Sequence, residues 1–72
     1  MYMKLKQPKR VRLMLAQRKQ WVTIGEIANG LDLHRNTVSK SLRGHAIDAS
    51  TAKAIADAAN VDVMDIAEFT EL

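Results

Sequence analysis

Apolar side chains between residues 8 and 19 recur with the spacing of an α-helix. Val11, Met14 and Leu15 lie three and four positions apart, so they share one face of a helix. Pro8 suits the first turn, where a missing backbone N–H costs no intrahelical hydrogen bond. The pattern therefore predicts a helix that begins near Pro8 and contributes this apolar face to a core.

A second helix is signalled at its start by Thr23, which stands three residues before Glu26. This is the spacing of a capping box, in which each side chain accepts a hydrogen bond from the other residue's backbone N–H. The pair Asn29-Gly30 signals a hairpin only between alternating strands, and its flanks do not alternate. We therefore expect that pair to end the helix. The apolar residues expected on its buried side are Ile24, Ile27, Ala28 and Leu31.

A third helix is expected to begin near His34 or Arg35 and to stop at Gly44, a residue suited to the left-handed end of a helix. Its apolar residues are few, because only Val38 and Leu42 form an i, i+4 pair. The candidate binding residues of this helix are polar or basic. They are Arg35, Asn36, Thr37, Ser39, Lys40 and Arg43.

Two more helices are expected after Gly44. One begins at Asp48, a suitable N-cap, and ends at Asn60, which tolerates the left-handed conformation. A shorter one follows Asp62, also a suitable N-cap. The side chains expected to close the core from this last helix are Val63, Ile66 and Phe69.

Helix signals thus recur along the chain, whereas strand signals do not. A chain of 72 residues suits one small domain. We therefore predict an all-α fold of five helices in a single domain over residues 1–72. Within it we expect a helix-turn-helix at 23–44 and a flexible basic N-terminus at 1–7.

The polar face of the third helix consists of residue types that read DNA. Arginine can form paired hydrogen bonds with guanine, and asparagine can do so with adenine. Serine and threonine can bond bases or phosphates, and lysine and arginine near the helix end can hold phosphates. A helix of roughly 10 Å diameter fits a major groove about 12 Å wide. A solvated polar face is the simpler interpretation of each residue alone, but six of them after a capped helix and a tight corner favour DNA.

The charge distribution agrees with a polyanionic partner. The chain carries a formal net charge of +3, and this charge is unevenly spread. Residues 1–20 hold seven lysines or arginines and no acid, whereas residues 46–72 hold six acids against Lys53. Such polarity suggests a positive face for nucleic acid and a negative region that faces elsewhere.

The segment from Thr23 to Gly44 resembles the helix-turn-helix of lambda-repressor-like proteins, the group that includes phage Cro and C-type repressors. The likeness continues through Asp48 and "NVDV" at 60–63, and it covers roughly residues 9–69. The resemblance implies a five-helix domain, a cytoplasmic transcriptional regulator of phage type, and a homodimer on a two-fold operator in double-stranded DNA. By position, it implies base contacts for Arg35, Asn36, Ser39 and Lys40, and phosphate contacts for Thr37 and Arg43.

This sequence departs from the family pattern at three positions. Asp32 stands where the turn usually has glycine, although aspartate tolerates the left-handed conformation better than most residues. His34 stands where serine or threonine usually caps the third helix, so we expect a weaker cap. Ile24 replaces a polar residue, typically glutamine, that contacts phosphate and supports the reading helix.

Ile24 opens an alternative function. An exposed isoleucine beside the reading helix would suit a protein contact better than a phosphate contact. Small phage proteins that resemble this fold also act as antirepressors, which bind a phage repressor protein and block its DNA binding. The alternative partner is therefore a repressor, bound through the same surface and Ile24.

Other classes of function have little support in the sequence. His34 and His45 have no acid at ligand spacing and the chain has no cysteine, so we expect no metal and no cofactor. No nucleophile–base grouping or glycine-rich phosphate loop suggests an enzyme. No apolar run approaches the ~20 residues that span a bilayer, and the N-terminus lacks the apolar region of a signal peptide.

Overall fold

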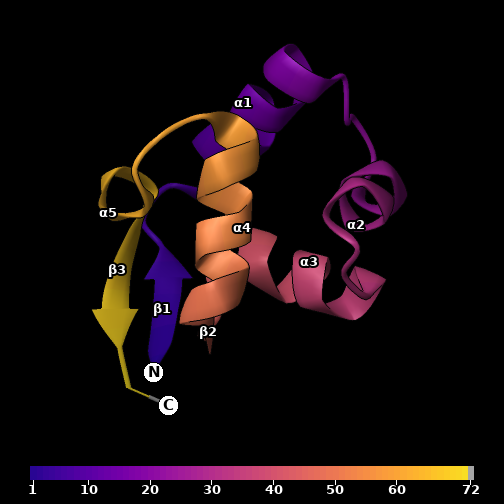
Figure 1. The fold of residues 1–72 in the computed structure, drawn as a ribbon. Helices are drawn as coiled ribbons and strands as arrows, with labels where there is room; N and C mark the ends of the chain where they lie inside the picture. The colour runs from indigo at the N-terminus through magenta and orange to yellow at the C-terminus, as the bar shows by residue number, and fades with distance from the viewer. Residues whose placement is uncertain (72) are drawn as a thin grey trace.

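The computed structural model describes residues 1–71, which form five helices and a small sheet (Figure 1). Most of the helix boundaries lie within a residue or two of those predicted from the sequence. The helices are α1 (Pro8–Lys19), α2 (Ile24–Leu31), α3 (Arg35–Leu42), α4 (Ala49–Ala59) and α5 (Val63–Ile66). The strands are β1 (Tyr2–Leu5), β2 (Ile47–Asp48) and β3 (Ala67–Thr70).

The sheet corrects the prediction of a purely helical fold. Its order is β2-β1-β3, and both pairings are antiparallel. Met3 lies opposite Ile47 on one side and opposite Phe69 on the other, so the sheet joins the two ends of the described chain. Strands of two to four residues are too short to show a clear alternating pattern, and their pairing is decided by contacts between distant segments.

The N-terminus at 1–7 is not the flexible basic tail that we expected. Met3 and Leu5 are only 2% and 4% exposed, and both belong to the hydrophobic core. Lys4 points outward, where its Nζ lies 3.9 Å from Oε1 of Glu68 on β3. Met3 and Leu5 therefore face the core from one side of β1 while Lys4 between them faces solvent, as successive residues of a strand do.

Helix α4 lies at the centre of the fold, with α2 and α3 on one side, β1 and β3 on the other, and α1 at its upper end (Figure 1). Each of these elements contributes side chains to the same core. The fully buried members with the largest side chains are Met3, Leu15, Ile27, Ile55, Val11 and Val38. The core therefore holds α2 against α4, a central helix that takes no part in the predicted helix-turn-helix, and it holds α3 against α2, α1 and the sheet.

One residue expected in the core lies at the surface. Phe69 is 56% exposed, although Val63 and Ile66 do pack on the core. The reason is that α5 ends at Ile66 and the chain continues as β3, so the helical spacing that linked Ile66 to Phe69 does not apply. Phe69 instead lies on the edge strand of the sheet, opposite Met3.

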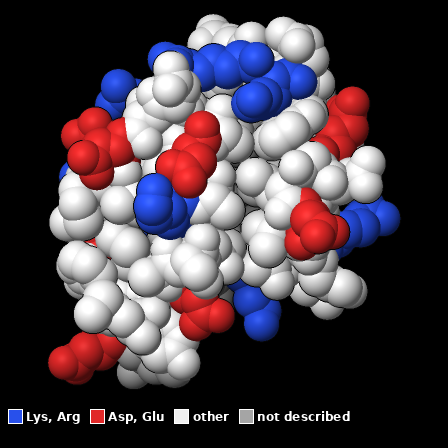
Figure 2. All heavy atoms as spheres, in the orientation of Figure 1, with Lys and Arg blue, Asp and Glu red and all other residues white. Residues whose placement is uncertain are grey.

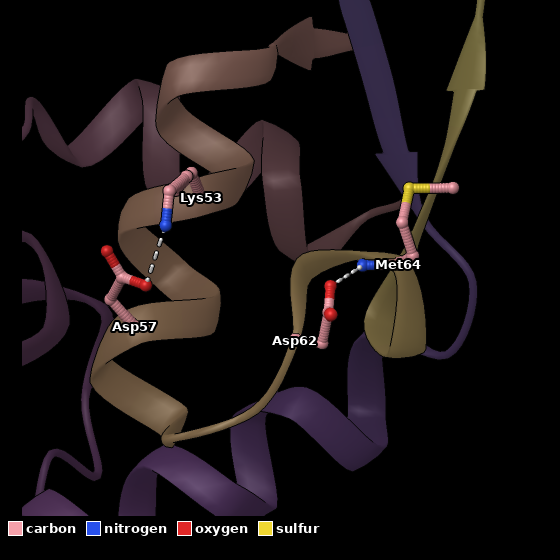
Figure 3. A network of polar contacts seen from close by, with 4 residues as sticks. All are labelled: Lys53, Asp57, Asp62 and Met64. Carbon is pink, nitrogen blue, oxygen red and sulfur yellow. Dashed lines mark hydrogen bonds and ion pairs between the residues drawn. The ribbon is translucent and has the colours of Figure 1, made fainter.

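Figure 3 shows two polar contacts in the region of α4 and α5, one within α4 and one at the start of α5. Asn60 ends α4 in the left-handed conformation, with φ 58°, as predicted. Asp62 caps α5, since its Oδ1 accepts a hydrogen bond of 3.0 Å from the backbone N–H of Met64. Within α4, Nζ of Lys53 donates to Oδ1 of Asp57 at 3.2 Å. Asp48 precedes α4 at the N-cap position but makes no capping hydrogen bond through its side chain.

None of the helices in residues 1–71 combines the length and the apolar character that a membrane crossing would require.

Candidate nucleic-acid interface

Helix α2 begins with the capping box that the sequence predicted. Oγ1 of Thr23 accepts a hydrogen bond from the Glu26 backbone N–H at 3.1 Å, and Oε1 of Glu26 accepts one from the Thr23 N–H at 3.0 Å. The same carboxylate also accepts from the Val22 N–H at 3.2 Å. The hydrogen bonds that the carboxylate accepts hold the pKa of Glu26 below its ordinary value. The bond from the Thr23 N–H has the largest effect, followed by the bond from the Val22 N–H. The first turn of α2, where the helix-turn-helix begins, is therefore stabilised by the Glu26 carboxylate.

The end of α2 differs from the prediction. The helix passes through Asn29 and Gly30 and ends at Leu31. Gly30 lies inside the last turn, and its missing Cβ leaves the space that the indole ring of Trp21 occupies. Trp21 is half-buried and packs on the core, so it connects the segment before α2 to the last turn of that helix.

The corner between α2 and α3 closes without glycine. Asp32 adopts the left-handed conformation, with φ 56° and ψ 45°, and its backbone N–H reaches the carbonyls of Ala28 and Asn29. Leu33 donates its N–H to the carbonyl of Ala28 at 2.9 Å. Leu31 and Leu33 are half-buried against the core. The departure at Asp32 therefore leaves the geometry of the turn intact.

His34 caps α3, although the sequence suggested only a weak cap there. Its Nδ1 accepts a hydrogen bond of 3.0 Å from the backbone N–H of Asn36. Sequence reasoning placed His34 at the cap position but left it out of the site, because the polar face of the third helix was counted from Arg35 onward. The available signal was its position directly before the helix, where any side-chain acceptor can satisfy a free backbone N–H.

Helix α3 has a buried side and an exposed side, with half-buried residues between them. Val38 is 1% exposed and Ser41 is fully buried, with its Oγ donating to the Thr37 carbonyl at 2.8 Å. The candidate residues lie outside this buried side. Arg35, Asn36, Lys40 and Arg43 are exposed, while Thr37 and Ser39 are half-buried.

The structure brings four of the seven candidate residues together. Ile24, Arg35, Asn36 and Ser39 line one shallow hollow between the starts of α2 and α3, and His34 completes it. Thr37 and Lys40 do not line this hollow. Arg43 lines a second one near the start of α1, beside Lys9.

Ile24 is half-buried and packs against the core, so it is not the freely exposed apolar side chain that an antirepressor contact would favour. It still forms part of the wall of the hollow at the start of α3. Its side chain offers no hydrogen bond, so the polar groups of that wall come from 34–39.

Positive charge is also present on α1, where Lys9 shares a hollow with Arg43. Lys9, Arg10, Arg12, Arg18 and Lys19 are all exposed on α1. Figure 2 shows basic side chains along the edge of the molecule where Figure 1 places α1. Within residues 1–71, His, Asp and Glu form no group of three that could hold a metal ion.

Comparison with known proteins agrees with this geometry. A family model described as the Cro/C1-type HTH DNA-binding domain matches residues 10–71, where HTH stands for helix-turn-helix. Searches among curated proteins and among solved structures gave no match. The matched residues include the capped α2, the corner at Asp32 and all of α3. The chain therefore belongs to the family of Cro/C1-type HTH DNA-binding domains.

Proposed function

We propose that this protein is a transcriptional regulator of phage type that binds operator DNA by placing α3 in the major groove. The observation that carries the proposal is the division of α3 into two sides. Val38 and Ser41 anchor it to the core with Leu42 packed beside them, whereas Arg35, Asn36 and Lys40 are polar or basic and accessible. In a family of DNA-binding domains, such a helix has the size and chemistry of a major-groove reader.

The positions of the side chains suggest a division of roles. Arg35, Asn36 and Ser39 share the hollow at the start of α3, and with Lys40 they are proposed to contact base edges. Thr37 and Arg43 are proposed to contact phosphates. Arg43 suits that role because Lys9 lies in the same hollow and adds a second positive charge.

The half-buried Ile24 is the observation that separates DNA from the alternative partner. An antirepressor needs a surface that a repressor protein can cover, and a large part of the Ile24 side chain is already covered by this protein's own core. The groups that remain accessible on α3 are donors and cations, which suit phosphates and base edges. We therefore propose DNA as the main partner.

Selection of binding sites from a random duplex library would test this function without knowledge of the operator. We expect enrichment of a defined sequence and binding that weakens steeply as salt rises. Two half-sites about 10 base pairs apart, related by two-fold symmetry, would indicate the homodimer that we also propose. Failure to enrich any sequence, together with no binding at low salt, would contradict the proposal.

The selected duplex then allows a test of α3. Arg35→Ala should weaken binding by about 1–3 kcal/mol and relax the preference at one base pair. Lys53→Ala is the matched control, because it also removes one exposed positive charge but lies on α4. Equal losses in the two variants would show that only net charge matters. A complex with a repressor protein, formed without DNA binding, would instead support the alternative function.

A further inference from the structure

The orientation of the His34 ring follows from the cap that it makes. A backbone N–H can only donate, so the Nδ1 atom that accepts from Asn36 at 3.0 Å carries no proton. The neutral ring must then hold its proton on Nε2. The cap of α3 therefore selects one tautomer of this histidine and makes its other nitrogen a donor.

That donor is free to meet a ligand. The two nitrogens of an imidazole diverge, so with Nδ1 turned to the backbone of α3, Nε2 faces away from it. His34 is exposed, and within residues 1–71 its Nε2 donates to no protein group. The ring thus offers a hydrogen-bond donor at the surface, held in place by the helix that it caps.

The neighbours of His34 indicate which ligand this donor would meet. The ring lines the same hollow as Arg35, Asn36 and Ser39, three of the residues proposed to contact DNA. Ile24 forms another part of that wall and supplies no polar group. A DNA duplex seated on the start of α3 would bring hydrogen-bond acceptors to this hollow.

We propose that His34 is a DNA-binding residue whose Nε2–H donates a hydrogen bond to the duplex, while its Nδ1 caps α3. This inference rests on the proposed function, and it adds a residue that lies outside the polar face predicted from the sequence. The acceptor is either a phosphate oxygen or an acceptor atom on a base edge, since both take a neutral N–H donor. The same side chain then stabilises the start of α3 and binds DNA.

Replacing His34 by asparagine separates the two roles. Asparagine is among the best N-cap residues, so His34→Asn should keep α3 capped and leave the melting temperature unchanged or higher. Its shorter amide does not place a donor where Nε2 lies. We expect affinity for the selected duplex to fall about tenfold, the size typical of one lost hydrogen bond to a charged or paired group. If His34 were only a cap, His34→Asn would bind DNA as the native protein does.

The dependence on salt provides a second readout. The capped ring is neutral, so His34→Asn should shift the binding curve without changing its slope against salt concentration. Lys40→Ala removes a cation and should reduce that slope by about one if Lys40 reaches a phosphate. A lower slope in His34→Asn would contradict the neutral donor.

Base-substituted duplexes distinguish the two acceptors. A phosphate contact predicts that His34→Asn loses the same factor on every duplex, whereas a base contact predicts that the loss is confined to one base pair. Either pattern supports the proposal.

Nuclear magnetic resonance tests the tautomer without DNA. Correlation of the ring protons with both nitrogens at pH 8 should show Nδ1 unprotonated and Nε2 protonated. The opposite tautomer, or unchanged affinity in His34→Asn, would overturn the inference and leave the proposed function intact. A native protein that binds no DNA would overturn both.

Discussion

The indole ring of Trp21 lies against Gly30, in the last turn of α2. A Cβ on Gly30 would be 2.7 Å from Cη2 of the ring, and nearer still to two other ring atoms. Real side chains do not approach so closely, so the glycine is required by the position of Trp21. The contact joins the segment before α2 to the end of that helix, and so fixes the position of α2 relative to the segment that precedes it.

We therefore expect Gly30→Ala to destabilise the protein, even though alanine favours helices. The indole is a rigid ring that packs on the core, and moving it should cost about 1–3 kcal/mol. Urea unfolding followed by the fluorescence of Trp21, the only tryptophan, would measure the loss. Gly25→Ala is the control in the same helix, because its nearest neighbour, Oγ1 of Thr23, would be 3.9 Å away. A stable Gly30→Ala variant with an unchanged emission spectrum would refute the contact.

Glu26 should make the stability of the protein depend on acidic pH. Its pKa is lowered in the folded state by the N–H groups of Thr23 and Val22, so its contribution is complete above the ordinary value of 4.5. The contribution is lost as pH falls through the lowered folded-state pKa. Glu26→Gln should be less stable than the native protein at pH 7, and the two should converge as pH falls from 5 toward 3. Parallel melting curves at every pH would contradict this linkage.

Asp32 should respond to substitution according to its left-handed backbone. With φ at 56°, Asp32→Gly removes a steric cost and should leave stability equal or raise it by up to about 1 kcal/mol. Asp32→Ala should lower stability by about 1 kcal/mol, because alanine lacks the local hydrogen bonding that helps aspartate in this region. Thermal unfolding of the two variants tests this order. The reverse order would mean that the corner does not adopt this conformation in solution.

The N-terminal strand should behave as part of the core. Leu5 is 4% exposed, so Leu5→Ala should cost about 2–4 kcal/mol. Lys4→Ala, at the neighbouring exposed position, should cost well under about 1 kcal/mol, since its pair with Glu68 is a surface pair. Chemical denaturation compares the two, and amide exchange at Leu5 provides an independent check. Equal small effects of the two substitutions would indicate that residues 1–7 are the flexible tail that the sequence suggested.

The helix-turn-helix was predictable because its signals are local. The capping box at Thr23 and the sparse apolar residues of α3 each act within a few positions of the chain, and the structure confirms them. The left-handed corner at Asp32 is equally local. The misplaced end of α2 shows the limit of this reasoning, because the pair Asn29-Gly30 was interpreted as a turn signal and not by the ring that packs on Gly30.

The sequence by itself determined the helices, the capping box at Thr23 and the polar face of α3, since hydrogen bonds and side-chain spacing within a short segment decide them. Only the tertiary structure decided that the basic N-terminus is a strand, that Phe69 lies outside the core, and that His34 joins the hollow beside Ile24. The physical reason is distance along the chain. Pairing between β1 and β3 brings together residues from opposite ends of the chain, and no local pattern records which segments will meet.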